Sequence, residues 1–282
     1  MRILVLGGNG FIGGNIANSL NAMRAEVFVG GRNLENKSNV ITIKVEKMHK
    51  LDSWIPILNS FDVVINAVGI LRERRGENYH DVHTKAPAAL ANACAKLDIR
   101  LIHISAIDLS TQAKSGFIRS KYLGEQSIIE SGANAVIVRA SLLDGQGGYG
   151  AKWFRRVASW PIQFVMKSEG LIAPLQVIDL ADAVANLVMN NIKTPNIIEL
   201  GGIEVVSIPD YLQLLRLRLG KGRAIQISVP KSLVCIASYI FDLFALTPLS
   251  FGHFELMQGY NVPSENKLLF LLRREPNLVG LL

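Results

Sequence analysis

Three glycines near the N-terminus stand at a spacing that suits phosphate binding. Gly7, Gly10 and Gly13 form the pattern Gly-x-x-Gly-x-x-Gly between a short apolar run and a helical pattern. The first glycine permits a sharp turn, the second lets backbone approach a pyrophosphate, and the third lets a helix pack closely on a strand. Free N–H groups at the helix start then attract the phosphates. We therefore predict that this loop, with Phe11 and Ile12, binds a dinucleotide; a purely structural turn is the alternative.

The end of the second predicted strand bears on the choice between NAD and NADP. An NAD site usually has a carboxylate there, which accepts a hydrogen bond from the ribose 2′-hydroxyl. This chain has Gly30, Gly31 and Arg32 instead, and a guanidinium can make a bidentate contact with a 2′-phosphate. We expect NADP(H) to be favoured. NAD(H) is the alternative, with Arg32 as a solvated surface residue.

Small residues also end the fourth predicted strand, where the sequence reads Asn66, Ala67, Val68 and Gly69. Ligands of open α/β sheets bind outside the carboxyl ends of the strands. Small side chains there let a ribose lie against backbone. We therefore expect these four residues to contact the cofactor.

Strand and helix patterns alternate through the first two hundred residues and supply the frame for these loops. Such alternation, with nearly all-apolar strands, predicts an α/β, doubly wound parallel-sheet Rossmann fold. Strands are expected at residues 2–6, 26–29, 41–45, 63–67, 101–105, 135–139 and 197–200, and helices at residues 11–23, 83–97, 117–131, 179–190 and 209–219. We expect residues 1–145 to form the NAD(P)-binding core. Residues 146–282 would add the remaining Rossmann elements and a smaller, mostly helical C-terminal lobe for substrate or partner.

Composition excludes several classes of protein. The chain has 282 residues and two cysteines, Cys94 and Cys235, which we expect to be buried thiols rather than a disulfide framework. No Cys/His cluster has metal-ligand spacing, so no metal is expected. The net charge of +7 suits an acidic ligand, an anionic membrane or nucleic acid. Because no nucleic-acid motif and no basic patch interleaved with aromatic residues occurs, nucleic acid is excluded.

An apolar run at residues 233–249 raises the mean hydropathy to +0.28. Asp242 and Pro248 interrupt it, and it is shorter than the roughly 20 residues of a spanning helix. Two interpretations remain, a buried or dimer-interface helix and a helix at a membrane surface. The apolar run at the N-terminus is too short for a signal peptide. We expect a cytoplasmic protein, with attachment at the periphery of the inner membrane as the alternative.

These motifs together resemble the short-chain dehydrogenase/reductase superfamily, in its atypical and extended branch, also known as the NAD-dependent epimerase/dehydratase group. The resemblance covers nearly the whole chain. Strings at residues 85–94, 101–106, 119–125 and 200–202 resemble the branch that contains the nucleotide-binding accessory subunit of mitochondrial complex I and its bacterial relatives.

The resemblance implies a catalytic Ser, Tyr and Lys, whose matched positions here are Ser105, Phe117 and Lys121. Phenylalanine has no ionisable proton and cannot serve as a general acid or base. Tyr122 does not replace it, because it points about 100° around the helix from Lys121. Tyr79, from the loop after the fourth strand, is a substitute donor to consider. Lys121 is interpreted as a ribose contact, or else as a solvated lysine, and Ser105 as an active-site residue, or else as a small residue ending its strand.

Two functions follow from this departure. In the first, the chain binds NADP(H) as a structural or sensing ligand, is weakly active or non-catalytic, and acts through a partner protein or a membrane. In the second, it is an active NAD(P)-dependent reductase, dehydrogenase or nucleotide-sugar epimerase/dehydratase that uses another proton donor. An oligomer is compatible with either function.

Further polar side chains are candidates for contacts rather than chemistry. A basic loop after the fourth strand is interpreted as a solvated face or as a site for an acidic group, and it contains Arg72, Arg74 and Arg75. A basic and aromatic segment is a candidate for a flap facing substrate or membrane, and it contains Trp153, Arg155, Arg156 and Trp160. We expect His83 to contact the start of a helix and His103 to lie within the core.

Overall fold

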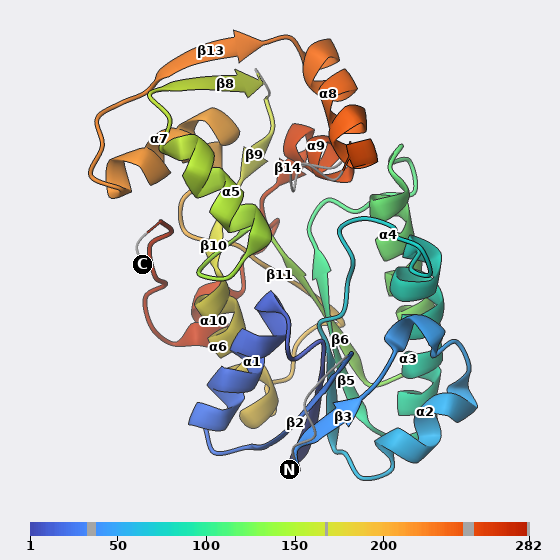
Figure 1. Ribbon diagram of the computed structural model, residues 1–282. Coiled ribbons are helices and arrows are strands. Elements are labelled where there is room, and N and C mark those ends of the chain that lie inside the picture. The colour runs from blue at the N-terminus through green and yellow to red at the C-terminus, as the bar shows by residue number, and fades with distance from the viewer. Residues whose placement is uncertain (33–37, 167–168, 245–250, 281–282) are drawn as a thin grey trace.

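Seven parallel strands form the central sheet of the computed structural model, which describes residues 1–32, 38–166, 169–244 and 251–280 (Figure 1). The strand order is β3-β2-β1-β4-β5-β6-β11, so the chain reverses its direction of travel across the sheet between β1 and β4. The strands are β1 (Arg2–Leu6), β2 (Glu26–Gly31), β3 (Val40–Thr42), β4 (Val63–Asn66), β5 (Arg100–Ala106), β6 (Ala135–Ala140) and β11 (Ile197–Leu200). This confirms the doubly wound α/β fold. It also places the carboxyl ends of β1 and β4 side by side, where ligands bind in such sheets.

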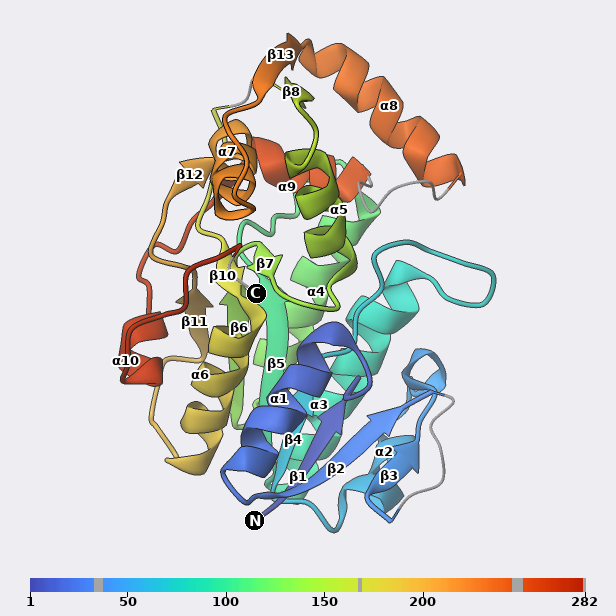
Figure 2. The same cartoon turned by 60° about the vertical axis from the view of Figure 1, so that its left-hand side comes forward.

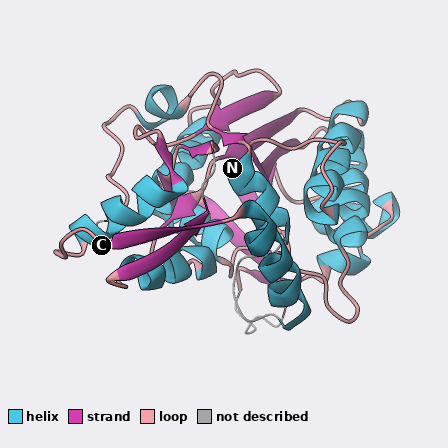
Figure 3. Cartoon of the chain, turned by 90° about the horizontal axis from the view of Figure 1, so that it is seen from above, coloured by secondary structure: helices cyan, strands magenta, loops and turns pink. Residues whose placement is uncertain are grey.

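Helices cover both faces of the sheet, as the view from above shows (Figure 3). On one face lie α1 (Phe11–Ala22), α6 (Val177–Met189) and α10 (Leu268–Leu272); on the other lie α2 (Leu51–Leu58), α3 (Ala86–Leu97) and α4 (Gly116–Glu130). The Ser115 hydroxyl accepts a hydrogen bond from the Ile118 N–H at 3.1 Å and so caps the start of α4. Helix α3 ends where Asp98 adopts a left-handed conformation, with φ of 55°.

Side chains of alternate strand residues point to opposite faces of the sheet and pack into two separate apolar cores. Ile3 and Val5 of β1 face α1 and α6, where they meet Ile16. Leu4 and Leu6 face the other way, toward Trp54 of α2. Because both faces are covered, the strands carry apolar residues at nearly every position, which explains why the sequence predicted them well.

The C-terminal lobe lies above the carboxyl ends of the strands (Figures 1 and 2). Its helices are α5 (Tyr149–Ala158), α7 (Ile208–Arg218), α8 (Lys231–Phe244) and α9 (Phe251–Gln258). Small sheets join them, formed by β7 (Leu143–Asp144), β8 (Ile162–Met166), β9 (Leu171–Ile172), β10 (Leu175–Gln176), β12 (Val206–Ser207), β13 (Ile225–Val229) and β14 (Tyr260–Asn261). The sequence predicted α7, at residues 209–219, and a helix in the apolar run that begins as α8, but it did not predict α5, the bounds of α9 or the pairing of β8 with β13.

Buried charged groups fasten the lobe to the core. Asp144 pairs with Arg155 of α5 at 2.8 Å and accepts the Gly280 N–H at 2.7 Å. Asp179, at the start of α6, accepts hydrogen bonds from the backbone N–H and side-chain amide of Asn277. Each carboxylate is fully buried and satisfied, as buried charges must be. The lobe and the C-terminal tail are thus held to two points near the carboxyl edge of the sheet.

Several local expectations need correction. Strand β3 is shorter than predicted, and a π-helical turn (His80–Lys85) precedes α3 where a continuous helix was expected. Cys94 is buried, but Cys235 is only half-buried. The apolar run begins as α8, in which Leu233 and Ile236 are 57% and 58% exposed, so this part is not buried within the chain. Residues 245–249 of the run lie outside the described residues. Among the helices that the structure describes, none combines the length and hydropathy needed to cross a bilayer.

Candidate functional site

The glycine loop forms the turn that its spacing predicted. Gly7 has a φ of +75°, and its N–H donates to the Gly30 carbonyl at 2.8 Å. The Gly10 N–H donates to the Gly7 carbonyl, also at 2.8 Å. A Cβ on Gly13 would lie only 2.3 Å from that same carbonyl oxygen, so α1 can approach β1 this closely only with glycine there.

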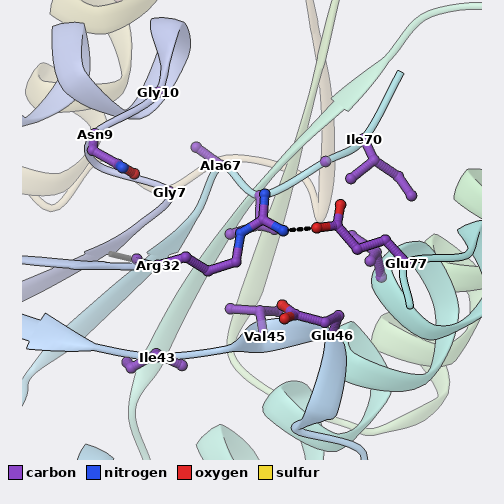
Figure 4. A pocket seen from close by; sticks show the side chains of 14 residues that line it. Gly7, Asn9, Gly10, Arg32, Ile43, Val45, Glu46, Ala67, Ile70 and Glu77 are labelled. Carbon is purple, nitrogen blue, oxygen red and sulfur yellow. Dashed lines mark hydrogen bonds and ion pairs between the residues drawn. The ribbon is translucent and has the colours of Figure 1, made fainter. Parts of the chain in front are cut away.

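A cavity of about 170 Å³ opens beside this loop and is bounded by the ends of β1, β2 and β4 (Figure 4). Asn9, Arg32 and Glu46 line it together with backbone of Gly7, Gly10 and Ala67. The guanidinium of Arg32 points across the cavity and forms an ion pair with the carboxylate of Glu77. Sequence analysis missed Glu77, because it lies in the irregular loop after β4, 45 residues from Arg32.

A second cavity, of about 420 Å³, adjoins the first, because Gly10, Ala67 and Ile70 line both. Phe11 and Ile12 lie on its wall, as do Ser105, Phe117 and Lys121. The structure therefore brings the glycine loop, the end of β4 and the Ser105–Lys121 pair to one continuous hollow at the carboxyl edge of the sheet. Parallel strands place their ends at the same edge, which is why these distant segments meet.

Ser105 and Lys121 both lie where polar groups have few partners. Ser105 is 6% exposed, and among the described residues its Oγ has no hydrogen-bond partner. The Lys121 ammonium lies 5.7 Å from the centre of the Phe117 ring. Burial lowers the pKa of Lys121, and the carboxylate of Glu125 offsets this only in part. That carboxylate is itself paired with Arg139 at 2.5 Å. Both groups are thus available to a bound ligand.

His83 packs between the ring of Tyr79 and the ring of Phe117, and Phe117 lies on the cavity wall. The ring of Tyr79 stacks on His83 with centres 5.5 Å apart, and Phe117 meets His83 edge-on at 5.6 Å. The Nε2 atom of His83 accepts the Ile70 N–H at 3.1 Å, so Nδ1 carries the proton and faces Ser120 Oγ at 3.0 Å. Burial lowers the pKa of His83 well below its usual value, and Lys121 lowers it further. His83 is therefore neutral and orients the loop after β4.

His103 is a core residue, as predicted. It lies on β5, 5% exposed, and its Nδ1 accepts the side-chain amide of Asn66 at 3.1 Å. The Asn66 Oδ1 in turn accepts the Val68 N–H. Burial lowers the pKa of His103 to about 3. This chain of hydrogen bonds fixes the bend at which β4 ends beside the cavity.

Two helices of the lobe close the cavity from the other side. Helix α5 contributes Trp153 and Phe154, and α9 contributes Leu256. The Glu255 carboxylate accepts the N–H groups of Lys114 and Ser115 at 2.7 and 2.8 Å, which ties α9 to the N-terminus of α4. No local signal in the sequence marks α9 as part of the site, because its contacts lie 140 residues away.

Other candidates from the sequence lie outside the larger cavity. Arg72, Arg74 and Arg75 occupy the loop between β4 and α3 and are not on its wall. Arg155 pairs with Asp144, and Arg156 is exposed on the opposite side of α5 from Phe154. The hydroxyl of Tyr79 donates to the Leu71 carbonyl at 3.0 Å and does not line the cavity. Among the described residues, Tyr149 is the tyrosine that lines the larger cavity.

Comparisons with known proteins agree with the geometry. The chain is 25% identical over 191 residues to NADH dehydrogenase (ubiquinone) 1 alpha subcomplex subunit 9 of Dictyostelium discoideum, covering 66% of this chain and 53% of that protein. The mouse protein of the same name is 26% identical over 256 residues, covering 86% of this chain and 67% of that protein. The chain thus spans about half to two thirds of the length of these relatives.

Among solved structures, the Bordetella bronchiseptica enzyme WbmG, in complex with NAD, shares the fold with a TM-score of 0.69. That match has 16% identity and covers 99% of this chain and 89% of the other. The model of the RmlD substrate binding domain matches residues 1–203. The chain therefore belongs to the RmlD substrate binding domain family, within the short-chain dehydrogenase/reductase superfamily.

Proposed function

We propose that the chain binds NADP(H) in the two adjoining cavities and is weakly active or non-catalytic, serving as a nucleotide-binding accessory protein. The observation that carries this proposal is the continuous hollow from Arg32, past the bare backbone of Gly10, to Lys121. The adenosine half of the dinucleotide would take the smaller cavity, the pyrophosphate the start of α1, and the nicotinamide ribose the space beside Lys121. Residues 1–145 would hold this cofactor, and residues 146–282 would receive a substrate or partner.

The preference for NADP(H) rests on Arg32. Its guanidinium already points into the smaller cavity, where a 2′-phosphate could replace Glu77 as its partner. Glu77 also supports the alternative, since its carboxylate could accept a hydrogen bond from the 2′-hydroxyl of NAD(H). Binding of NAD in the WbmG structure supports a pyridine dinucleotide in general and not one of the two.

The low activity rests on Phe117, which faces the cavity beside Lys121. A phenyl ring cannot exchange a proton with a substrate. Ser105 and Lys121 still line the same space, which supports the second function, an active reductase, dehydrogenase or nucleotide-sugar epimerase/dehydratase with another proton donor.

Titration calorimetry with NADPH and NADH, together with identification of any nucleotide that co-purifies, tests cofactor binding. Gly10→Ala adds a methyl group to the cradle, with only the Gly7 carbonyl nearby at 3.1 Å, so the fold should tolerate it while affinity falls. Gly14→Ala, one turn further along α1, is the matched control. Absence of heat with both dinucleotides would reject the proposal.

The proposed low activity is tested by measuring turnover of a panel of carbonyl compounds and nucleotide sugars by the wild type and by Phe117→Tyr. We expect no appreciable turnover by the wild type. Rapid wild-type turnover would favour the active reductase or epimerase. Activity gained only by Phe117→Tyr would identify the missing proton donor as the cause.

An accessory role also needs a surface for a partner protein. Four apolar side chains share the outer face of the β8–β13 pair, where Ile225 lies opposite Ile162 and Ile227 opposite Phe164. Phe164 and Ile225 are 65% and 66% exposed. Exposed apolar faces of this kind mark interaction sites. The complex I subunits among the relatives support a protein partner, and such a complex would place the chain at the periphery of a membrane.

Native electrophoresis of cell membranes tests this surface. The wild-type chain should migrate with a larger complex, and Phe164→Asp should release it. Leu123→Asp, which alters an exposed leucine on α4, is the control. Equal migration of both variants with the complex, or free migration of the wild type, would rule out the β8–β13 face as the contact.

A further inference from the structure

Polar groups are distributed unevenly over the wall of the larger cavity. Its described wall has four side chains with a hydroxyl or ammonium group: Ser105, Lys121, Ser141 and Tyr149. Ser141 is already committed, because its Oγ donates to the Asn261 carbonyl at 2.7 Å and accepts the Ala173 N–H at 3.1 Å. Tyr149 is 54% exposed and stands at the opening. Ser105 and Lys121 therefore supply the hydroxyl and ammonium groups that remain for a ligand deep in the cavity.

Apolar side chains form the part of the wall that faces Ser105 and Lys121 from the lobe. Trp153 and Phe154 come from α5, Leu256 comes from α9, and Ile70 and Leu71 come from the loop after β4. An apolar ligand that covers this wall removes apolar surface from water, which stabilises the complex by roughly 25 cal/mol for each Å² buried. Among these side chains only Trp153 carries a polar group, the indole N–H, so this part of the wall offers few hydrogen bonds to the several hydroxyl groups of a sugar.

Charge separates this cavity from a site for nucleotide sugars. The diphosphate of such a substrate carries at least two negative charges, which proteins usually meet with several cations or with backbone N–H groups at a helix start. Lys121 is the only charged side chain on the described wall. In the proposed function it already faces the nicotinamide ribose, and the start of α1 already holds the cofactor pyrophosphate. A second diphosphate would lose its hydration in this cavity without finding enough cations or hydrogen-bond donors to compensate for that cost.

We propose that the lobe side of the larger cavity binds an apolar molecule that carries a single carbonyl or hydroxyl oxygen. The inference rests on the proposed function, because the dinucleotide takes the sheet side of the same cavity. The oxygen accepts a hydrogen bond from Ser105 Oγ, which is buried and has no partner among the described residues. The apolar body lies between α5, α9 and Leu71. The whole cavity, which the apolar molecule would share with the nicotinamide half of the dinucleotide, has a volume of about 420 Å³.

Calorimetric titration of 2-undecanone into the protein saturated with NADP⁺ tests the assignment. NADP⁺ cannot reduce a ketone, so the heat reports binding alone. UDP-glucose is titrated in parallel as the nucleotide-sugar probe. We expect saturable binding of 2-undecanone and none of UDP-glucose. Tighter binding of UDP-glucose, or no binding of 2-undecanone, would overturn the inference.

Matched variants locate the site. Leu71→Lys introduces a cation at the cavity wall, and Leu123→Lys makes the same change on α4 outside the cavity; the two leucines are 43% and 45% exposed. Leu71→Lys should weaken 2-undecanone at least tenfold and Leu123→Lys less than twofold. Ser105→Ala should weaken it about three- to tenfold through the lost hydrogen bond. Equal effects of the two lysine variants would place the ketone elsewhere.

A titration of NADP⁺ without ketone keeps the two proposals apart. If NADP⁺ binds and 2-undecanone does not, the cofactor proposal stands and the apolar ligand is rejected. If 2-undecanone binds with the expected variant pattern and NADP⁺ does not, the cofactor proposal fails and the cavity assignment stands. Circular dichroism of each variant verifies that the fold is retained.

Discussion

Replacement of Arg32 by alanine separates the two cofactors most directly. In the free protein the guanidinium is paired with Glu77, and its side chain is 47% exposed. NADPH must therefore break this pair before its 2′-phosphate can take over the guanidinium. NADH has no phosphate at that position and gains nothing from Arg32.

The expected magnitude follows from these two steps. A hydrogen bond to a charged group contributes about 1.5–3 kcal/mol, and an ion pair this exposed contributes about 0.2–1 kcal/mol. The net gain from Arg32 is then about 0.5–2.8 kcal/mol. Since about 1.36 kcal/mol corresponds to a factor of ten, Arg32→Ala should weaken NADPH by roughly 2- to 110-fold and leave the affinity for NADH unchanged.

Calorimetry with both dinucleotides measures the difference, and the result is read against two controls. Glu77→Gln removes the competing partner and should strengthen NADPH by up to about fivefold, the equivalent of the exposed pair. Arg75→Ala changes the net charge equally at an exposed position in the loop after β4. Equal weakening of NADPH and NADH by Arg32→Ala would refute the 2′-phosphate contact. A larger loss of NADH than of NADPH in Glu77→Gln would assign the site to NAD(H).

Three further predictions concern the residues around the cavity. Burial lowers the pKa of Lys121, so its charge is disfavoured in the folded state. Lys121→Met should therefore raise the free energy of unfolding, measured in urea at pH 7, and at the same time weaken the binding of NADPH. A lower free energy of unfolding in this variant would contradict the prediction. The pKa of His103 is about 3 in the folded state and about 6.5 in the unfolded state. As the pH drops from 6.5 toward 3, the unfolded state therefore takes up a proton that the folded state does not. The free energy of unfolding should fall over this range by up to about 1.4 kcal/mol per pH unit. His103→Gln should reduce that slope in urea titrations at several pH values, and an unchanged slope would assign it to other groups. Gly13→Ala should lower the melting temperature, because its Cβ would lie 2.3 Å from the Gly7 carbonyl oxygen. Gly14→Ala should not, because its Cβ would lie 3.3 Å from the Gly8 carbonyl oxygen. Equal melting temperatures of the two variants would show that the glycine loop shifts to accommodate the Cβ of Gly13→Ala.

The sheet was predictable because its signals are local. Strands β1 and β11 begin and end at the predicted residues, since a run of apolar residues covered on both faces is unambiguous. The glycine loop was equally predictable, because a fixed spacing of glycines determines its turn. The ends of most predicted helices deviate by one or two residues, but α3 begins three residues later than predicted, after a π-helical turn that had no local signal. Helices α2 and α5 were not predicted.

The lobe and part of the site could not be predicted, because their contacts join distant segments. Strand β8 pairs with β13 in the register Ile162 to Ile225, so the partners are 63 positions apart in the sequence. Glu77 reaches Arg32 only after the loop between β4 and α3 folds over the end of β2. No pattern in an eleven-residue window contains such information. The sequence alone therefore predicted the turn of the glycine loop but not the ion pair between Arg32 and Glu77 beside it.

The hydrogen bonds from the N–H groups of Lys114 and Ser115, just before α4, to the Glu255 carboxylate offer a way to observe whether a ligand occupies the larger cavity. Leu256, the next residue, touches whatever fills the cavity, so a ligand that steadies α9 also steadies the carboxylate at its neighbour. Deuterium uptake at Lys114 and Ser115 should then slow when the hollow is filled, although neither residue lies on its wall. Hydrogen exchange at these two amides, measured by mass spectrometry, would then report whether the cavity holds a ligand without requiring any turnover.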